Sequence, residues 1–401
     1  MTLEHAWASY LQAATREFKA AQDRAGDAYP HFTRGGRWEL LSVERRSGPA
    51  GASYDHGNWT AGFWFGSMWI LALGSGCADV AALAGSRLHQ LVPRADDATT
   101  HDLGFLFYPS VVLGVEAGFL DRAAASPALG AARMLARRFN PHGDYLQAFG
   151  PIGDAQYAGT STIDTMMNVP LLWWASARGA DATVFDIARR HARTSARLYL
   201  RDDGSTYHLN RFDPNSGALL QRGTFQGAGE DSCWSRGQAW AVCGFAWAFA
   251  ATGEVEFLSA AQRAAQYYFE HLPESGIPPW DFSDRSPDAP RDASASAITA
   301  LGALVLAHVH PDAGARRRFG SQGAELLASL SAQCLNEDGA TDGILLHSCY
   351  SRPHGLGVDS AVAWGDFFLG LALGLAVGRI PLSVVLGCPT RDMEQRAVSR
   401  R

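Results

Sequence analysis

Residues 234–272 read WSRGQAWAVCGFAWAFAATGEVEFLSAAQRAAQYYFEHL, and the pattern in this stretch decides the fold class. Apolar residues recur at spacings of three and four on both sides of one short break, which predicts two α-helices, 234–252 and 254–272. Because so short a connection turns the chain straight back, the two helices are expected to pack side by side as a helical hairpin.

The rest of the chain repeats this pattern from end to end. The ten other predicted helices are 3–24, 60–74, 79–93, 102–119, 122–138, 162–177, 181–199, 292–309, 312–333 and 359–377. Connections after the second, fourth, sixth, eighth and tenth helices are short, whereas those after the first, fifth, seventh, ninth and eleventh are long. Six hairpins with their long loops on one face predict an all-α (α/α)6 barrel, with a cleft over one end. Runs of β-branched residues with period two are scarce, so we expect no extensive sheet.

A helical repeat solenoid is the competing architecture, but the sequence shows no consensus recurring at a fixed period.

The composition favours one folded domain. The chain has 401 residues, of which 47% are hydrophobic and 18% charged, so it can bury a large core and is not intrinsically disordered. No Gly/Ser-rich or Pro-rich linker divides it, and we expect a single barrel domain over 1–380 followed by a peripheral tail over 381–401. The net charge of −6, without a basic block, disfavours a nucleic-acid partner.

Residue usage excludes several kinds of chemistry. Lys19 is the only lysine and lies in the first predicted helix, which argues against a Schiff-base lysine or a phosphate-binding lysine loop. The six cysteines are far apart, so we expect neither a zinc site nor a disulfide framework, and no cofactor. The first twenty residues hold no apolar run of signal-peptide length, and no apolar stretch is long enough to span a membrane. We therefore expect a cytoplasmic protein.

Chemically distinctive residues cluster where the even-numbered helices begin. They are Asn58, Trp59 and Thr60; His101 and Asp102; Thr162, Ile163 and Asp164; Trp234, Arg236 and Trp240; Arg291 and Asp292; Asp359 and Trp364. If the hairpins are correct, all of these residues face one cleft. Tryptophans at such positions can stack on the flat faces of sugars, with the helix core as the alternative for each of them.

Asp102 and Asp164 are the candidate catalytic pair. An Asp before an apolar run is also a preferred helix N-cap, and this alternative stands for both residues and is favoured for Asp292. Apolar neighbours raise the pKa of a carboxyl group and a helix N-terminus lowers it, and the sequence leaves that balance open. One protonated and one ionised carboxyl group in a Trp-lined cleft are suited to glycoside chemistry. Arg236 can bind an acidic sugar through two hydrogen bonds, with a structural ion pair as the alternative.

A collinear series of motifs resembles the unsaturated glucuronyl hydrolases, glycoside hydrolase family 88. The motifs are NWTAGFWFGSMW (58–69), HDLGFLFYPS (101–110), YLQAFGP (145–151), TIDTMMNVPLLWWA (162–175), TYHLNRFDPNSG (206–217), GTFQG (223–227), WSRGQAWAVCGFA (234–246), WDF (280–282), RDASASAITALG (291–302) and AVAWGDFFLGLAL (361–373). They cover most of the chain.

The resemblance implies an (α/α)6 barrel and a specific reaction. Members of this family hydrate the C4=C5 double bond of the unsaturated uronic acid that lyases leave at a non-reducing end, and the resulting hemiketal opens and releases the remaining oligosaccharide. By the same resemblance, Asp164 is the general acid and base, and Asp102 holds the sugar hydroxyls and supports the charge around Asp164. The implied substrate contacts are Trp59, His101, Phe149, His208, Gln226, Arg236 and Trp240. Phe149 stands where well-known members have Trp, and Tyr350 in loop 341–358 is a further expected contact.

Three other functions remain open at the level of sequence. An unsaturated rhamnogalacturonyl hydrolase shares the barrel and the reaction but acts on pectin fragments. A sugar 2-epimerase on the same barrel relies on histidine pairs, and a non-catalytic sugar-binding helical protein would function without Asp164.

Overall fold

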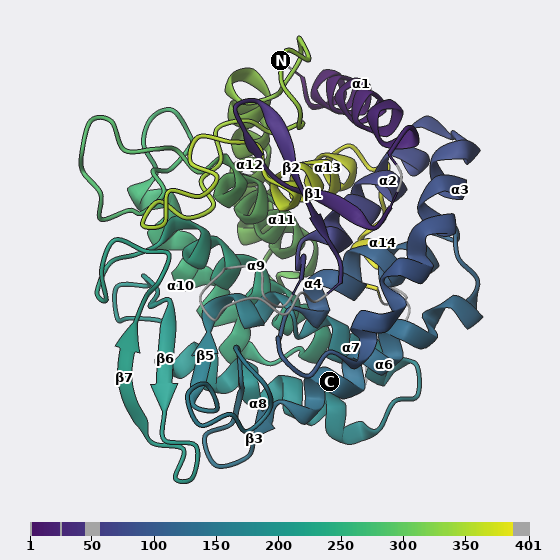
Figure 1. The fold of residues 1–401 in the computed structure, drawn as a ribbon. Coiled ribbons are helices and arrows are strands. Elements are labelled where there is room, and N and C mark those ends of the chain that lie inside the picture. The colour runs from purple at the N-terminus through teal and green to yellow at the C-terminus, as the bar shows by residue number, and fades with distance from the viewer. Residues whose placement is uncertain (1, 25, 45–56, 388–401) are drawn as a thin grey trace.

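The computed structural model describes residues 2–24, 26–44 and 57–387, in which one ring of helices lies inside another (Figure 1). In order of contact, the inner ring of the described part consists of α2 (Ala61–Ser75), α4 (Leu103–Phe107), α7 (Pro170–Ala177), α9 (Ser235–Thr252), α11 (Ala293–Val309) and α13 (Ala363–Ala376), which closes on α2. The outer helices are α1 (Leu3–Gln22), α3 (Ala78–Arg87), α6 (Ser126–Arg137), α8 (Ala182–Leu198), α10 (Val255–His271) and α12 (Ala313–Gln333). Each outer helix packs on an inner one, so the predicted (α/α)6 barrel is confirmed.

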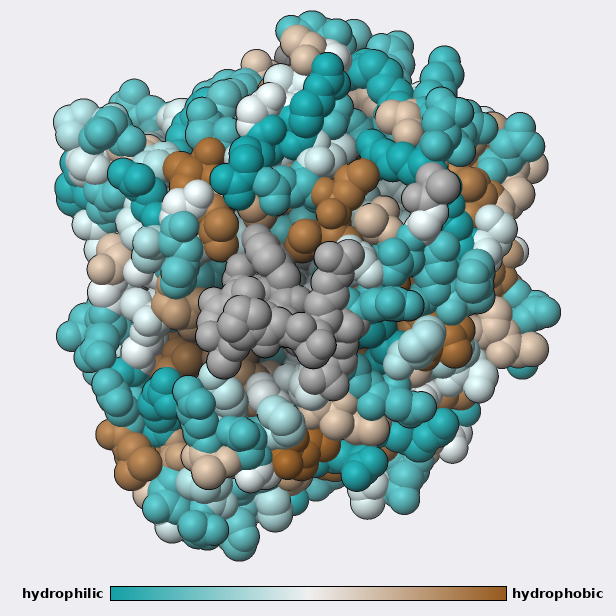
Figure 2. Space-filling view, in the orientation of Figure 1, coloured by the Kyte–Doolittle hydropathy of each residue, from teal (hydrophilic) through white to brown (hydrophobic). Residues whose placement is uncertain are grey.

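Burial separates the two rings. Every residue from Ala293 to Leu306 of α11 is buried, whereas α12 buries one stripe that includes Phe319, Leu326 and Leu330. A helix that is apolar all round belongs inside a core, and an amphipathic helix covers it. On the face of the molecule drawn in Figure 2, hydrophilic residues predominate. No helix of the described ranges is long and apolar enough to cross a membrane.

Prolines alter two of the predicted helices. The expected helix 102–119 changes from α4 to a π-helical turn at Tyr108–Val112, which contains Pro109, before α5 (Leu113–Glu116). The expected helix 162–177 begins with a 3-10 helix, Ile163–Met167, and α7 starts afresh at Pro170. Proline lacks the N–H that an α-helix interior requires, but it fits the first turn of a new helix. The three other 3-10 helices in the described ranges are Leu88–Gln90, Val92–Asp96 and Arg122–Ala125.

Short strands, which were not predicted from the sequence, lie in the long loops. They are β1 (Ala28–Arg34) paired with β2 (Arg37–Ser42), β3 (Phe139–Asn140) with β4 (Tyr145–Leu146), and the sheet β5 (Thr160–Thr162), β6 (Leu209–Phe212) and β7 (Leu219–Gly223). All of the pairs are antiparallel. Because β5 ends immediately before Ile163, its pairing with β6 fixes the backbone that leads to Asp164.

Two boundaries near the C-terminus differ from expectation. The predicted helix 359–377 starts only at Ala363, because Asp359 has a φ of 52° and belongs to the preceding loop. The start of the expected tail is not loose, since α14 (Leu382–Val385) packs on the barrel and the Val385 carbonyl accepts a 3.0 Å hydrogen bond from the Tyr108 hydroxyl. The prediction of a peripheral tail stands only for 388–401, which lie outside the described residues.

Asp366 is a buried carboxyl group in α13 whose charge opposes folding. Its Oδ1 accepts hydrogen bonds from the backbone N–H groups of Ile344 (3.1 Å) and Leu345 (2.7 Å). Burial nevertheless raises the pKa of Asp366 well above its ordinary value, and the nearby Glu17 charge raises it further. The folded protein therefore binds more protons here than the unfolded chain, and the free energy of unfolding falls as pH rises from about 4 through the raised pKa.

Asp366→Asn is expected to stabilise the protein increasingly as pH rises. Asparagine keeps an oxygen for the two N–H donors and carries no charge. The free energy of unfolding of the variant therefore does not fall at high pH as that of wild type does. Thermal unfolding at pH 5 and pH 8 checks this, with a larger gain in Tm at pH 8. Asp312→Asn is the control, because an Ala315 N–H bond lowers the pKa of Asp312 and gives the opposite pH trend. Equal gains for Asp366→Asn at both pH values would contradict the prediction.

Candidate active site

Asp102 and Asp164 stand at the N-terminal ends of two neighbouring inner helices. Asp102 precedes α4, and Asp164 lies in the first turn of the 3-10 helix that leads into α7. Neither Asp102 nor Asp292 makes a side-chain hydrogen bond that caps its helix, so the capping alternative is wrong for both. The side chains of Asp102 and Asp164 are partly exposed, whereas the residues that follow them are buried.

Asp102 is held by two neighbours in sequence. The Thr100 hydroxyl donates a 2.9 Å hydrogen bond to Oδ2, and the His101 Nε2 lies 3.3 Å from Oδ1. The other ring nitrogen of His101, Nδ1, lies 2.7 Å from the Thr165 hydroxyl. The buried imidazole of His101 therefore links Asp102 to the segment that carries Asp164.

Asp164 has the environment of a general acid. Burial raises its pKa and outweighs every other influence, the charge of Asp102 raises it further, and His101, Thr162 and Arg236 act in the lowering direction. The Thr162 hydroxyl donates a hydrogen bond to Oδ1. Desolvation is the largest influence on Asp164 and its direction is upward, so the structure favours the raised pKa of the two directions that the sequence left open.

Aromatic rings form one wall beside the two carboxyl groups. Phe149 packs edge-on to His101 at 5.9 Å and to Phe225 at 5.4 Å, measured between ring centroids. His208 lies between Phe225 (4.4 Å) and Trp234 (4.5 Å). Phe225 was missed as a site residue, although it lies inside the GTFQG motif.

His208 presents an unused polar atom in this wall. Its Nδ1 bonds the Thr224 hydroxyl at 2.8 Å, and its buried Nε2 has no hydrogen-bond partner among the described residues. Burial lowers the pKa of His208 to about 3, and the positive charge of Arg236 contributes in the same direction. A neutral imidazole with one free nitrogen is suited to a hydrogen bond with a ligand hydroxyl.

A second aromatic cluster contains two more candidates. The Trp59 indole stacks on Trp364 with a centroid distance of 5.2 Å, and its centroid lies 6.2 Å from the Tyr350 ring. His31 packs edge-on to both Trp59 and Tyr350, and nothing in the sequence pointed to it. Gln226 joins the cluster, because its side-chain amide donates a 3.1 Å hydrogen bond to the Tyr350 carbonyl.

Arg236 and Trp240 are buried in the protein interior. Both are 1% exposed. The Arg236 guanidinium bonds Asp292 at 2.8 Å and the carbonyls of Cys349 and Tyr350 at 2.5 and 2.6 Å, so it takes the form of the structural ion pair considered as its alternative. Trp240 packs on core phenylalanines of α4 and α13. Neither side chain lies open to a sugar in this structure.

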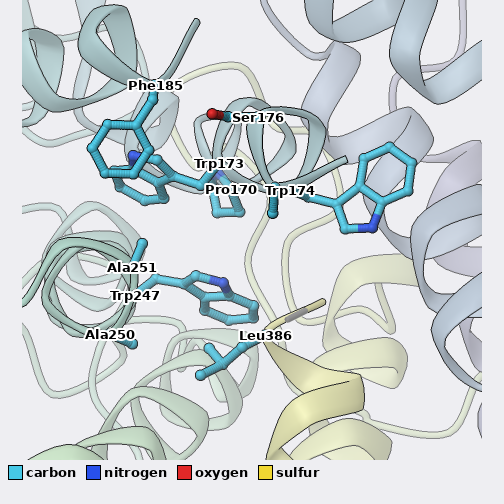
Figure 3. Close-up of a pocket in the computed structure, with 10 residues that line it drawn as sticks. Pro170, Trp173, Trp174, Ser176, Phe185, Trp247, Ala250, Ala251 and Leu386 are labelled. Carbon is cyan, nitrogen blue, oxygen red and sulfur yellow. The ribbon is translucent and has the colours of Figure 1, made fainter. Parts of the chain in front are cut away.

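A separate apolar pocket lies at the far end of the barrel (Figure 3). Its lining residues are Pro170, Trp173, Trp174, Ser176, Ala177, Phe185, Trp247, Ala250, Ala251 and Leu386. Ala250 follows Arg236 by fourteen residues of the same helix, which at 1.5 Å per residue is about 20 Å along its axis. This pocket offers no carboxyl group, and much of the tryptophan surplus belongs to it and to the core.

The described residues contain no group of three His, Cys, Asp or Glu side chains that could hold a metal ion. The groups that gather at this end of the barrel include two linked carboxyl groups, the imidazoles of His101 and His208, and aromatic rings.

Comparisons with known proteins identify the family. No protein-family model matches the chain. The chain is 32% identical over 352 residues to the unsaturated glucuronyl hydrolase of Bacillus sp. strain GL1, covering 86% of this chain and 89% of that protein. It is also 32% identical over 321 residues to the unsaturated chondroitin disaccharide hydrolase of Streptococcus pneumoniae, covering 78% and 80% of the two chains. The crystal structure of the Bacillus enzyme superposes with a TM-score of 0.83 over 93% of this chain and 96% of that one. The chain therefore belongs to the unsaturated glucuronyl hydrolases, glycoside hydrolase family 88.

Proposed function

We propose that this protein hydrates the C4=C5 double bond of an unsaturated uronic acid at the non-reducing end of an oligosaccharide. The observation that carries the proposal is Asp164, a partly exposed carboxyl group whose pKa is raised by burial and which is joined through hydrogen bonds to a second carboxyl group. A carboxyl group with a raised pKa keeps its proton to higher pH than an ordinary one, which suits it to act as a proton donor.

The reaction needs one proton donor and one water molecule. Asp164 donates its proton to C4, and the positive charge that develops at C5 is shared with the ring oxygen. Water then adds to C5 while the Asp164 carboxylate takes a proton from it, so the carboxyl group ends the cycle protonated as it began. The hemiketal formed in this way opens and releases the rest of the oligosaccharide without further help from the protein.

The surrounding residues receive binding roles in this proposal. Asp102, held by Thr100 and His101, accepts hydrogen bonds from sugar hydroxyls. The free Nε2 of His208 meets a polar group of the uronate, and Phe149 and Trp59 offer aromatic faces to the sugars. Gln226 and Arg236 hold the Tyr350 backbone and so place the Tyr350 ring beside Trp59.

The proposed substrates are unsaturated disaccharides of the glycosaminoglycan type. The S. pneumoniae relative is named for chondroitin disaccharides, and the Bacillus structure is described as responsible for glycosaminoglycan degradation. We place the reaction in the cytoplasm, on fragments imported after a lyase has acted, without a metal or cofactor.

Loss of ultraviolet absorbance tests this function. The conjugated C4=C5 chromophore disappears on hydration, so wild-type protein is expected to bleach unsaturated chondroitin and hyaluronan disaccharides steadily. A saturated disaccharide is the blank. Bleaching of unsaturated rhamnogalacturonan fragments alone would reassign the enzyme to pectin, and failure on every unsaturated uronide would refute the hydrolase.

A further inference from the structure

A continuous chain of hydrogen bonds connects the two carboxyl groups. It runs from Asp102 Oδ1 to His101 Nε2 (3.3 Å), from His101 Nδ1 to the Thr165 hydroxyl (2.7 Å), and from there to the Thr162 hydroxyl (3.4 Å). The Thr162 hydroxyl ends the chain at Asp164 Oδ1. Thr162 and Thr165 are both fully buried, so water does not compete for their hydroxyl groups.

The number of protons in this chain fixes its direction. Each Thr hydroxyl has one proton to donate. When Thr162 donates to Asp164, Thr165 must donate to Thr162, and the Thr165 oxygen must accept from Nδ1–H of His101. Since Nε2 of His101 faces Asp102, a proton is needed there too, and His101 is then an imidazolium paired with the Asp102 carboxylate.

This direction decides which oxygen of Asp164 carries the catalytic proton. Because Oδ1 already accepts from Thr162, a proton on Asp164 must sit on Oδ2, which has no hydrogen-bond partner among the described residues. The reverse direction requires a neutral His101 and places the proton on Oδ1. There it is donated in a hydrogen bond to the Thr162 hydroxyl and is not available to the substrate.

We propose that Thr162 and Thr165 are positioning residues. Their hydroxyl groups carry the donor–acceptor direction set by the Asp102–His101 pair along the hydrogen-bond chain to Asp164, and so keep the proton of Asp164 on Oδ2. This inference rests on the proposed function, because it concerns the acid of that reaction. It gives Asp102 and His101 a second task besides contact with the sugar, since they orient two hydroxyl groups that never touch the substrate.

The other charged groups around the chain are consistent with a cationic His101. Arg236 acts electrostatically on Asp164, and Arg138 interacts electrostatically with Asp102, so both positive charges favour ionised carboxyl groups. His191 is a further titratable group near His101, and burial lowers the pKa of His191 to about 3, so it is neutral and does not repel the imidazolium. Asp102 is therefore the anion that His101 pairs with.

Valine and serine substitutions test the role of the hydroxyl groups. Thr165→Val and Thr162→Val are expected to lower kcat by roughly 10- to 100-fold, the worth of a hydrogen bond to a charged group, with KM changed less than about twofold. Thr162→Val also moves the basic limb of the pH–kcat profile to higher pH, because the donor that stabilises the carboxylate is gone. Thr165→Ser and Thr162→Ser keep the hydroxyl groups and are expected to restore kcat to within a few-fold of wild type.

Thr160→Val is the matched control. Thr160 lies in the same strand, is equally buried and bonds the Tyr157 carbonyl outside the chain, so its kcat and pH profile are expected to match wild type. Valine variants that keep the wild-type kcat and basic limb, or serine variants as impaired as the valine ones, would overturn the proposal.

Nitrogen-15 NMR of His101 tests the direction of the same hydrogen-bond chain without any catalytic turnover, because it measures which ring nitrogens carry a proton. Wild type at neutral pH is expected to show an imidazolium with both nitrogens protonated, and Thr165→Val a changed Nδ1 shift. A neutral His101 in wild type would refute the assigned direction. Absence of bleaching by wild type would refute the proposed function. The NMR measurement would still decide the direction of the hydrogen-bond chain.

Discussion

Asp164→Asn is expected to abolish turnover while leaving substrate bound. An amide of nearly the same shape cannot donate the proton that C4 requires or accept one from water, and loss of a general acid costs about 10³-fold in kcat. The Thr162 hydroxyl can still donate to the Asn oxygen, so the local fold is retained. The ultraviolet assay measures the loss of kcat, and calorimetric titration with the unsaturated disaccharide measures binding.

The control is Asp213→Asn, a partly exposed turn residue between β6 and β7 whose side chain accepts hydrogen bonds from the backbone N–H groups of Asn215 and Ser216. It is expected to keep the wild-type rate. If Asp164→Asn kept more than a tenth of wild-type activity, Asp164 would not be the acid. If it failed to bind the disaccharide, Asp164 would serve binding rather than chemistry.

Breaking the buried pair between Arg236 and Asp292 is expected to have the largest effect on stability. The two side chains are 1% and 0% exposed, and Asp292 also accepts a 2.5 Å hydrogen bond from the Ser294 hydroxyl. Arg236→Leu leaves the Asp292 charge buried without its partner, which costs about 3–5 kcal/mol of the free energy of unfolding. Urea denaturation measures the loss.

The double variant Arg236→Leu/Asp292→Leu separates the ion pair from simple packing. Removal of both charges is expected to recover part of the lost stability, because the uncompensated carboxylate is gone. A double variant that loses the sum of the two single losses would show that the two charges do not interact.

Arg236→Leu also distinguishes two roles in binding. A guanidinium that touched the uronate would lose affinity mainly for the acidic sugar, as the sequence alone suggested. In the structure the Arg236 guanidinium bonds the Tyr350 carbonyl, so we expect its loss to displace the Tyr350 ring and to weaken an acidic disaccharide and its methyl ester equally. If the variant lost affinity only for the acidic disaccharide, the result would show that Arg236 contacts the uronate directly.

Most of the barrel could be predicted because the signals are local. Helical periodicity and loop length depend on residues close together in the chain, and they placed all twelve barrel helices. Pro109 and Pro170 also indicated breaks in the two predicted helices that contain them. The sequence did not predict that the first lies in a π-helical turn and that the second starts a new helix. Strands such as β5 were missed, since a three-residue strand exists only through its partner β6, far along the chain.

The candidate site divides in the same way. Asp102 and Asp164 could be named because both begin inner helices, and His31 and Phe225 could not, because only contacts with Trp59 and His208 mark them. The role of Arg236 depended on Asp292, which is far away in sequence and adjacent in space. Sequence patterns identify a residue by type and position, whereas a side chain's partner is set by packing.

By itself, then, the sequence determined the ring of helical hairpins and the positions of Asp102 and Asp164 at the starts of two inner helices. Only the tertiary structure decided that burial raises the pKa of Asp164, that Arg236 bonds protein groups, and that two threonines join the carboxyl groups. The physical reason is that desolvation and hydrogen-bond direction depend on every atom around a group, and most of those atoms come from distant parts of the chain.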